Sequence, residues 1–205
     1  MNDKFFDLKK EKQDKMINGA MQVFASKGYK LASTDDMVKV AGVSKGLWFH
    51  YFVNKAGLYS FIADYGIRYL NMELSVSLLG GPSDYFHILF LVEETKVQVA
   101  KMYPYIPLMI QSMEDEDDEE IAEIAKSKLE SYKNIVNNAL ESFDNDKLVK
   151  YVSRDMLDMT VKYTLKGIRE KAYKNGVFDS DMYLHEVKDY FDMMRKITIE
   201  RGQNL

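Results

Sequence analysis

Residues 34–52 read TDDMVKVAGVSKGLWFHYF. Two short apolar segments flank Gly42, and glycine tolerates the left-handed backbone angles that a tight turn needs. Ser33 or Thr34 can cap the first segment as a helix, and Ser44 can cap the second. Two short helices joined by such a turn form a helix-turn-helix.

The second helix of this motif carries the residues that can read DNA. Its N-terminal turn reaches base edges in the major groove, and here it offers Lys45, Gly46 and Leu47. Lysine can meet a guanine edge or a phosphate, glycine lets the backbone approach, and leucine can touch a thymine methyl. His50 and Tyr51 can reach phosphates further along, although Tyr51 is equally suited to the core.

The residues around this turn have more ordinary roles. Lys55 follows Asn54, which can cap the next helix, so we expect the lysine and the helix N-terminus to bind one phosphate together. We expect Val43, Trp48 and Phe52 to lie in the core.

Apolar residues recur at three and four positions along the chain, which predicts an all-α protein of about nine helices. Gly28 is expected to end the first helix in a left-handed conformation, and Gly80 to Pro82 to break a later one. Pro104 and Pro107 frame a short irregular or helical turn. Outside residues 34–52, we expect helices over residues 8–27, 55–79, 83–101, 118–142, 148–175 and 180–201.

The penultimate segment is apolar on two faces, which predicts two packing partners. One partner is the core of its own domain, and the other could be a second subunit. One face carries Leu148, Val152, Met156, Met159 and Tyr163. The other carries Leu157, Val161, Leu165, Ile168 and Ala172. The last helix has apolar residues at matching spacing, namely Tyr183, Val187, Tyr190, Phe191, Met194 and Ile197.

Charge is distributed unevenly. Residues 1–59 hold ten lysines and six acids, a balance of +4, whereas the whole chain is at −4. This favours an anionic partner for the N-terminal part alone. The first twelve residues hold no apolar signal core, and no apolar run approaches a membrane span, so we expect a cytoplasmic protein without a membrane partner.

Metal sites and catalytic sites are disfavoured. The chain has no cysteine and three histidines, without metal-ligand spacing. A di-metal helical bundle needs glutamate three residues before histidine, but Asp84 precedes His87 and Met182 precedes His185. The acidic run Glu114–Glu120 is expected to be a solvated loop that leads into a helix. We therefore expect no cofactor, no metal and no catalytic residue.

The stretch from about Gln13 to Tyr59 resembles the DNA-binding domain of the TetR family of bacterial regulators. The matching residues are Ala20, Phe24, Gly28-Tyr29, Ala41 to Gly46, Phe49 to Phe52, Lys55 and Leu58. The resemblance implies a helix-turn-helix domain over residues 1–54 and a ligand-binding and dimerisation domain over residues 55–205. It also implies a homodimer through a four-helix bundle, formed by the segments at about 148–175 and 180–201.

The predicted DNA-binding set is Ser33, Thr34, Ser44, Lys45, Gly46, Leu47, Phe49, His50, Tyr51 and Lys55. Three features depart from the family pattern. Phe49 stands where tyrosine is common, Met37-Val38 replaces a common Ile-Ala, and no arginine precedes Arg68. DNA readout would therefore rest on lysine, apolar contacts and DNA shape.

The resemblance further implies a repressor that a small, largely apolar effector releases from a palindromic operator. Residues 60–205 hold nine methionines, eleven tyrosines and six phenylalanines, a composition that can adapt around an apolar guest or simply form a soft core. The candidate ligand residues are Tyr65, Tyr69, Met72, Phe86, Phe90, Met156, Met159 and Tyr163. The alternatives are a constitutive DNA-binding regulator, a helix-turn-helix used for protein contacts, and a helical-bundle enzyme.

Overall fold

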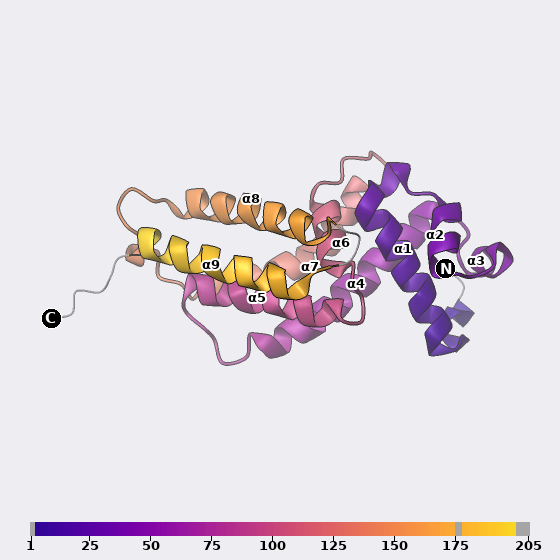
Figure 1. Cartoon of the computed structure of the whole chain (residues 1–205), viewed down its shortest axis with the longest axis horizontal. Coiled ribbons are helices and arrows are strands. Elements are labelled where there is room, and N and C mark those ends of the chain that lie inside the picture. The colour runs from indigo at the N-terminus through magenta and orange to yellow at the C-terminus, as the bar shows by residue number, and fades with distance from the viewer. Residues whose placement is uncertain (1–2, 175–177, 200–205) are drawn as a thin grey trace. The chain divides into compact units, whose positions relative to one another are not determined.

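The structure is a computed structural model that describes residues 3–174 and 178–199 (Figure 1). Within these ranges every regular element is helical, which confirms the all-α prediction. The elements are η1 (Asp3–Asp7), α1 (Lys10–Leu31), α2 (Thr34–Ala41), α3 (Lys45–Tyr51), α4 (Lys55–Ser77), α5 (Tyr85–Ala100), α6 (Ile106–Glu114), α7 (Ala122–Leu140), η2 (Asn145–Lys147), α8 (Arg154–Ala172) and α9 (Ser180–Thr198). The predicted helix ends at 175 and 200–201 lie outside the described residues. No described helix is long and apolar enough to cross a membrane.

The chain divides into two compact units. The first comprises Met1–Glu73 and Gln98–Lys133, and the second comprises Leu74–Val97 and Asn134–Leu205. The first unit includes α6, which packs against α1, together with the first part of α4. Packing therefore does not divide the chain at residue 54, and the division at that residue stays a prediction about function.

The core of the first unit forms around α1. Its predicted apolar face is buried, including Met16, Ile17, Ala20 and Phe24. Gly28 has φ 68° and interrupts the helical geometry, after which α1 continues to Leu31, beyond the predicted end at residue 27. α2 lies so close to α1 that position 19 has no room for a side chain, because a Cβ at Gly19 would lie 2.8 Å from the Cβ of Ala41.

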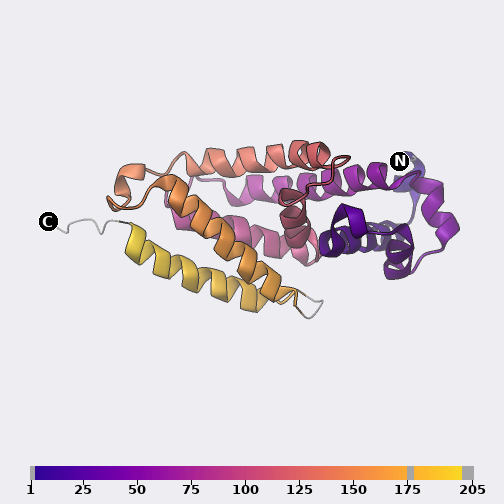
Figure 2. The ribbon, with the colours of Figure 1, turned by 90° about the horizontal axis from the view of Figure 1, so that it is seen from above.

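The second unit is built around α5, α8 and α9. Figures 1 and 2 show α8 and α9 as neighbours that run in opposite directions. One of the two predicted apolar faces of α8 is buried, at Leu157, Val161, Leu165 and Ala172. Its outer face is exposed: Met156 by 57%, Met159 by 55% and Tyr163 by 64%. The two-faced pattern is therefore present in the fold.

The predicted helix start at residue 148 was wrong, whereas the turn expected between Pro104 and Pro107 is present. The segment from residue 148 is not continuous with α8, because Ser153 caps α8 by accepting a hydrogen bond from the Met156 N–H at 3.2 Å. Leu148 and Val152 consequently precede the helix. The segment from Pro104 to Pro107 leads directly into α6, with Pro107 in its first turn, where a missing N–H costs nothing.

A buried ionic cluster joins the three main helices of the second unit. Glu93 of α5 accepts from Lys96 Nζ at 2.6 Å and lies 3.5 Å from Arg169 Nη2 of α8. It also accepts a hydrogen bond from the Tyr183 hydroxyl of α9. Burial by itself would raise the pKa of Glu93, but Lys96 and Arg169 hold the pKa below its usual range. The cluster therefore contains an ionised carboxylate in the core.

Candidate nucleic-acid interface

The helix-turn-helix is set by two serine caps and one glycine. Ser33 Oγ accepts from the Asp36 N–H at 3.1 Å and begins α2. Gly42 has φ 64° and ends it. Ser44 Oγ then accepts from the Leu47 N–H at 3.2 Å and begins α3. Local sequence thus fixes the turn, as predicted.

Aromatic packing holds the inner side of α3. Trp48 is fully buried and Phe52 nearly so, which confirms their predicted core positions. Their rings lie 5.5 Å apart. Tyr51 is also buried, with its ring 5.7 Å from that of Phe5 in η1. Tyr51 therefore lies in the core, and the packing role of Phe5 was missed from the sequence.

The outer side of α3 presents most of the predicted reading residues together. Lys45, Gly46, Phe49 and His50 are exposed, and Leu47 is half-buried. Lys45 Nζ forms a 2.7 Å ion pair with Asp35, and both groups are exposed to solvent. A Cβ at Gly46 would meet no atom within 4 Å, so packing inside the protein does not require glycine there.

Lys55 has a different environment from the one predicted. Its ammonium donates to the backbone oxygens of Tyr29 at 3.0 Å and Ala32 at 3.4 Å. It also lies 4.2 Å from the centre of the Tyr29 ring. These groups terminate α1, so Lys55 ties the start of α4 to the end of α1. Asn54 caps α4 as predicted, since its Oδ1 accepts from the Gly57 N–H at 2.7 Å. Ser33 is exposed and Thr34 is half-buried at the start of α2.

The acidic run between α6 and α7 contacts Tyr29. The Tyr29 hydroxyl donates to Glu120 at 2.8 Å, and its N–H donates to Glu116 at 3.2 Å. Burial, followed by the hydrogen bond to Glu120, raises the pKa of Tyr29. The run is therefore more than a solvated loop. Among residues 3–174 and 178–199, no cluster of acidic and histidine side chains is arranged to hold a metal ion.

The eight ligand candidates fall into separate groups. Tyr65 and Tyr69 pack with Tyr103 in the first unit, where the Tyr65 and Tyr103 hydroxyls lie 2.6 Å apart. Met72 is exposed on α4. Phe86 and Phe90 line a cavity between α5 and α9 in the second unit. The remaining three candidates, Met156, Met159 and Tyr163, lie on the exposed face of α8.

Known proteins share part of the sequence. The model of the family "Bacterial regulatory proteins, tetR family" matches residues 16–60. An uncharacterised HTH-type transcriptional regulator of Bacillus subtilis (strain 168), YvdT, is 32% identical over 85 residues. That alignment spans 41% of this chain and 43% of YvdT, so it covers less than half of either protein.

Solved structures share the fold over most of the chain. The fatty acid degradation regulator FadR from Bacillus halodurans aligns with a TM-score of 0.60 and 18% identity, over 87% of this chain and 96% of FadR. A TetR family transcriptional regulator from Chloroflexus aurantiacus J-10-FL aligns with a TM-score of 0.58 and 18% identity, over 98% and 99% of the two chains. At this identity the likeness establishes the fold alone.

Proposed function

We propose that this chain, which belongs to the TetR family of bacterial regulatory proteins, binds a near-palindromic DNA site as a homodimer and represses transcription until a small ligand releases it. The observation that carries the DNA-binding part is the outer side of α3. It offers Lys45, Gly46 and Leu47 at the start of a helix whose inner side is fixed by Trp48. A rigid helix with an accessible N-terminal turn suits the major groove.

Apolar surface supports the homodimer. Exposed apolar side chains continue along α8 at Met156, Met159 and Tyr163, and along α9 at Met193 and Ile197. Large exposed apolar side chains on two neighbouring helices are typical of an interface. Two copies would complete a four-helix bundle. A two-fold dimer places its recognition helices about 34 Å apart, one turn of DNA, which is why we expect a near-palindromic site.

Chain continuity supports release by a ligand. α4 begins at Lys55, next to the end of α1, and its last residues belong to the second unit. A ligand in the second unit that shifts α4 would move the start of that helix. Release requires the ligand to bind the non-DNA-binding arrangement more tightly, because equal affinity for both arrangements shifts nothing. We place this regulator in the cytoplasm, where its DNA lies.

The test is selection of a duplex from a randomised pool with the purified full-length protein, followed by titration of the winning duplex at several salt concentrations. We expect two chains per site and an affinity that falls steeply with salt, because lysines displace counterions from phosphates. Lys45→Ala and Leu47→Ala should each weaken binding about tenfold and relax the sequence preference.

Lys133→Ala is the matched control, since this exposed lysine lies on α7. It should bind like the wild type. Failure to enrich any duplex at low salt would contradict the proposal, as would unchanged sequence preference in both α3 variants. Binding that no small molecule alters would leave the constitutive regulator as the correct alternative.

A further inference from the structure

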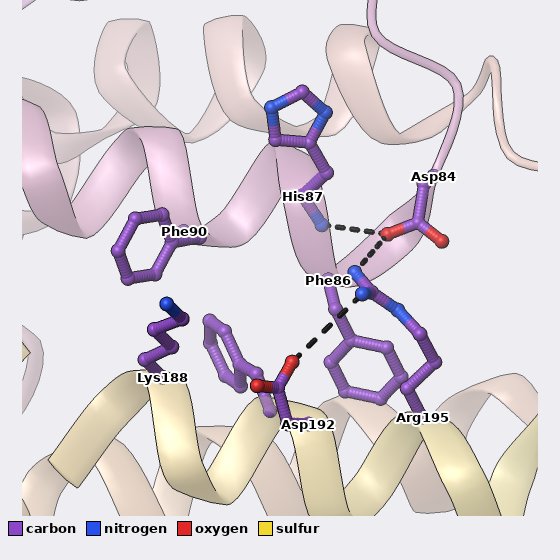
Figure 3. Close-up of a pocket in the computed structure, with 8 residues that line it drawn as sticks. Asp84, Phe86, His87, Phe90, Lys188, Asp192 and Arg195 are labelled. Carbon is purple, nitrogen blue, oxygen red and sulfur yellow. Dashed lines mark hydrogen bonds and ion pairs between the residues drawn. The ribbon is translucent and has the colours of Figure 1, made fainter. Parts of the chain in front are cut away.

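A cavity of about 470 Å³ lies within the second unit between the start of α5 and α9 (Figure 3). We infer that it binds an organic monoanion with an aromatic or other flat apolar body, whose acidic group pairs with Lys188. The inference rests on the proposed function only in naming this molecule as a class of effector, since the site itself needs no DNA. Cavities of this size accommodate small molecules.

The apolar walls come from both helices. Phe86 and Phe90 of α5 and Phe191 of α9 line the cavity. The Phe86 and Phe191 rings lie 5.5 Å apart, while Phe90 is only partly buried. A flat apolar molecule can contact these rings at the 4.5–7 Å centroid distances that aromatic groups prefer.

Three of the four charged side chains at the cavity are joined by ion pairs. Arg195 Nη2 lies 2.6 Å from Asp84 Oδ1, and its Nη1 lies 3.9 Å from Asp192. The same oxygen of Asp84 accepts the His87 backbone N–H at 2.8 Å, so Asp84 also caps α5. These contacts hold two carboxylates beside one guanidinium, a group with a net charge of −1, and Lys188 is the remaining charged group that lines the cavity.

Lys188 is placed to receive an anion. In Figure 3 its side chain rises from α9 toward the Phe90 ring. It forms no hydrogen bond or ion pair with any other residue that the structure describes. An ammonium group at the edge of an apolar cavity gains a charge-assisted hydrogen bond when a carboxylate or sulfonate approaches.

The cavity and the proposed dimer face lie on different sides of α9. At about 100° per residue, Lys188, Asp192 and Arg195 share one side of the helix. Met193 and Ile197 point roughly 150° away from them. A partner subunit on the exposed apolar face would therefore leave the cavity open.

Two fluorescent probes with the same aromatic body can test this inference. 1-Anilinonaphthalene-8-sulfonate carries one negative charge, and N-phenyl-1-naphthylamine lacks it. Each is titrated into the full-length protein without DNA. We expect the sulfonate to bind more tightly than the neutral probe. Lys188→Met should reduce sulfonate affinity about twofold to fivefold, as expected for loss of a charge-assisted contact to an exposed lysine, and leave the neutral probe unchanged.

Lys196→Met is the matched control, because this exposed lysine on α9 lies outside the cavity. It should bind both probes like the wild type. Phe90→Ala should weaken both probes, which locates the shared aromatic body in the cavity. Equal affinity of the wild type for the two probes would overturn the inference, as would an unchanged sulfonate affinity in Lys188→Met. Tighter binding of the neutral probe would indicate a ligand without charge.

The two proposals fail separately. Lys188→Met should bind the selected duplex like the wild type in the absence of probe. If neither protein binds any duplex, the proposed function fails, while the probe preference still decides the ligand site. If both bind duplex but the probes do not discriminate, the ligand inference alone fails.

Discussion

On both α3 and α8, an exposed outer face lies opposite a well-packed inner face. The two outer faces differ in the chemistry of their side chains. On α3 the exposed residues Lys45, Gly46 and His50 are basic or small, and they surround a single exposed ring, Phe49. On α8 the large exposed apolar residues are Met156, Met159 and Tyr163. A basic face suits a polyanion, whereas a face with large exposed apolar side chains suits a second apolar face. The side chains on each exposed helix face therefore predict which kind of partner that face binds.

The two units also place their polar contacts differently. In the first unit, serine and asparagine side chains cap α2, α3 and α4 at their exposed ends. In the second unit, Glu93 holds two cationic side chains inside the core. The caps of the first unit contribute small, separate amounts to the stability of the fold, whereas the groups around Glu93 form one coupled cluster. Single substitutions should thus have unequal effects in the two units.

The largest effect is expected for Glu93→Gln. Removing the carboxylate leaves Lys96 and Arg169 buried without their anion, which should lower the free energy of unfolding by about 3 kcal/mol. Urea unfolding at pH 7 measures this change. Glu94→Gln, on the neighbouring half-buried residue, is the control and should change stability by less than about 0.5 kcal/mol. A loss below about 1 kcal/mol in Glu93→Gln would contradict a coupled cluster.

A smaller effect, on association rather than folding, is expected for Met159→Lys. A charge at the centre of the proposed interface should raise the dimer dissociation constant about 30-fold, by leaving an ammonium without a partner. Sedimentation equilibrium measures the constant, and circular dichroism checks that the fold is retained. Lys162→Met, on an exposed position of the same helix, provides a comparison of opposite charge change. A dimer of unchanged strength in Met159→Lys would place the interface elsewhere.

Two helical glycines give the sharpest comparison of the faces. Added Cβ atoms at Gly46 and Gly167 would meet nothing within 4 Å. Alanine at either site should therefore raise the free energy of unfolding of the subunit by up to about 1 kcal/mol through helix propensity. We expect Gly46→Ala to weaken DNA binding without changing the dimer, and Gly167→Ala to weaken the dimer. The reverse assignment, or no effect on either, would show that the glycines are not there for a partner.

The smallest expected effect is on the acid stability of the protein, through Asp36. Hydrogen bonding from Ser33, followed by Lys27, lowers the pKa of Asp36. Because the pKa of Asp36 is lower in the folded state, its ionised carboxylate stabilises the fold fully above the unfolded-state pKa of about 4. This stabilisation is lost as the pH falls through the pKa of Asp36 in the folded state. Asp36→Asn should reduce the fall in melting temperature between pH 5 and pH 3, and Lys27→Met should give an intermediate result. An identical pH profile in all three proteins would argue against this contribution.

The sequence predicted the helix-turn-helix closely because its signals are local. Ser33, Gly42 and Ser44 each act within three residues of their own position. The predicted start at residue 148 failed because the apolar spacing of α8 extends back to Leu148 and Val152, while the cap at Ser153 decides where the helix begins. Helical periodicity alone does not distinguish apolar residues inside a helix from apolar residues that precede its cap.

Contacts between distant residues were not predictable. Lys55 bonds to carbonyl oxygens more than twenty residues earlier, so its position after a cap suggested a phosphate instead. Glu116 and Glu120 contact Tyr29 across about ninety residues. The same holds for Glu93 and Tyr183. Each of these is a polar contact whose partner depends on how separate helices pack, and charge or spacing along one segment carries no information about that.

Trp48 is the single indole of the chain, and it is fully buried beside Phe52 in α3. Its emission therefore comes from one site and should be blue-shifted in the native protein. Any transient opening of α3 would expose the ring to water and to collisional quenchers such as acrylamide. The rate at which Trp48 fluorescence is quenched in the native protein therefore reports how often α3 loosens from the core.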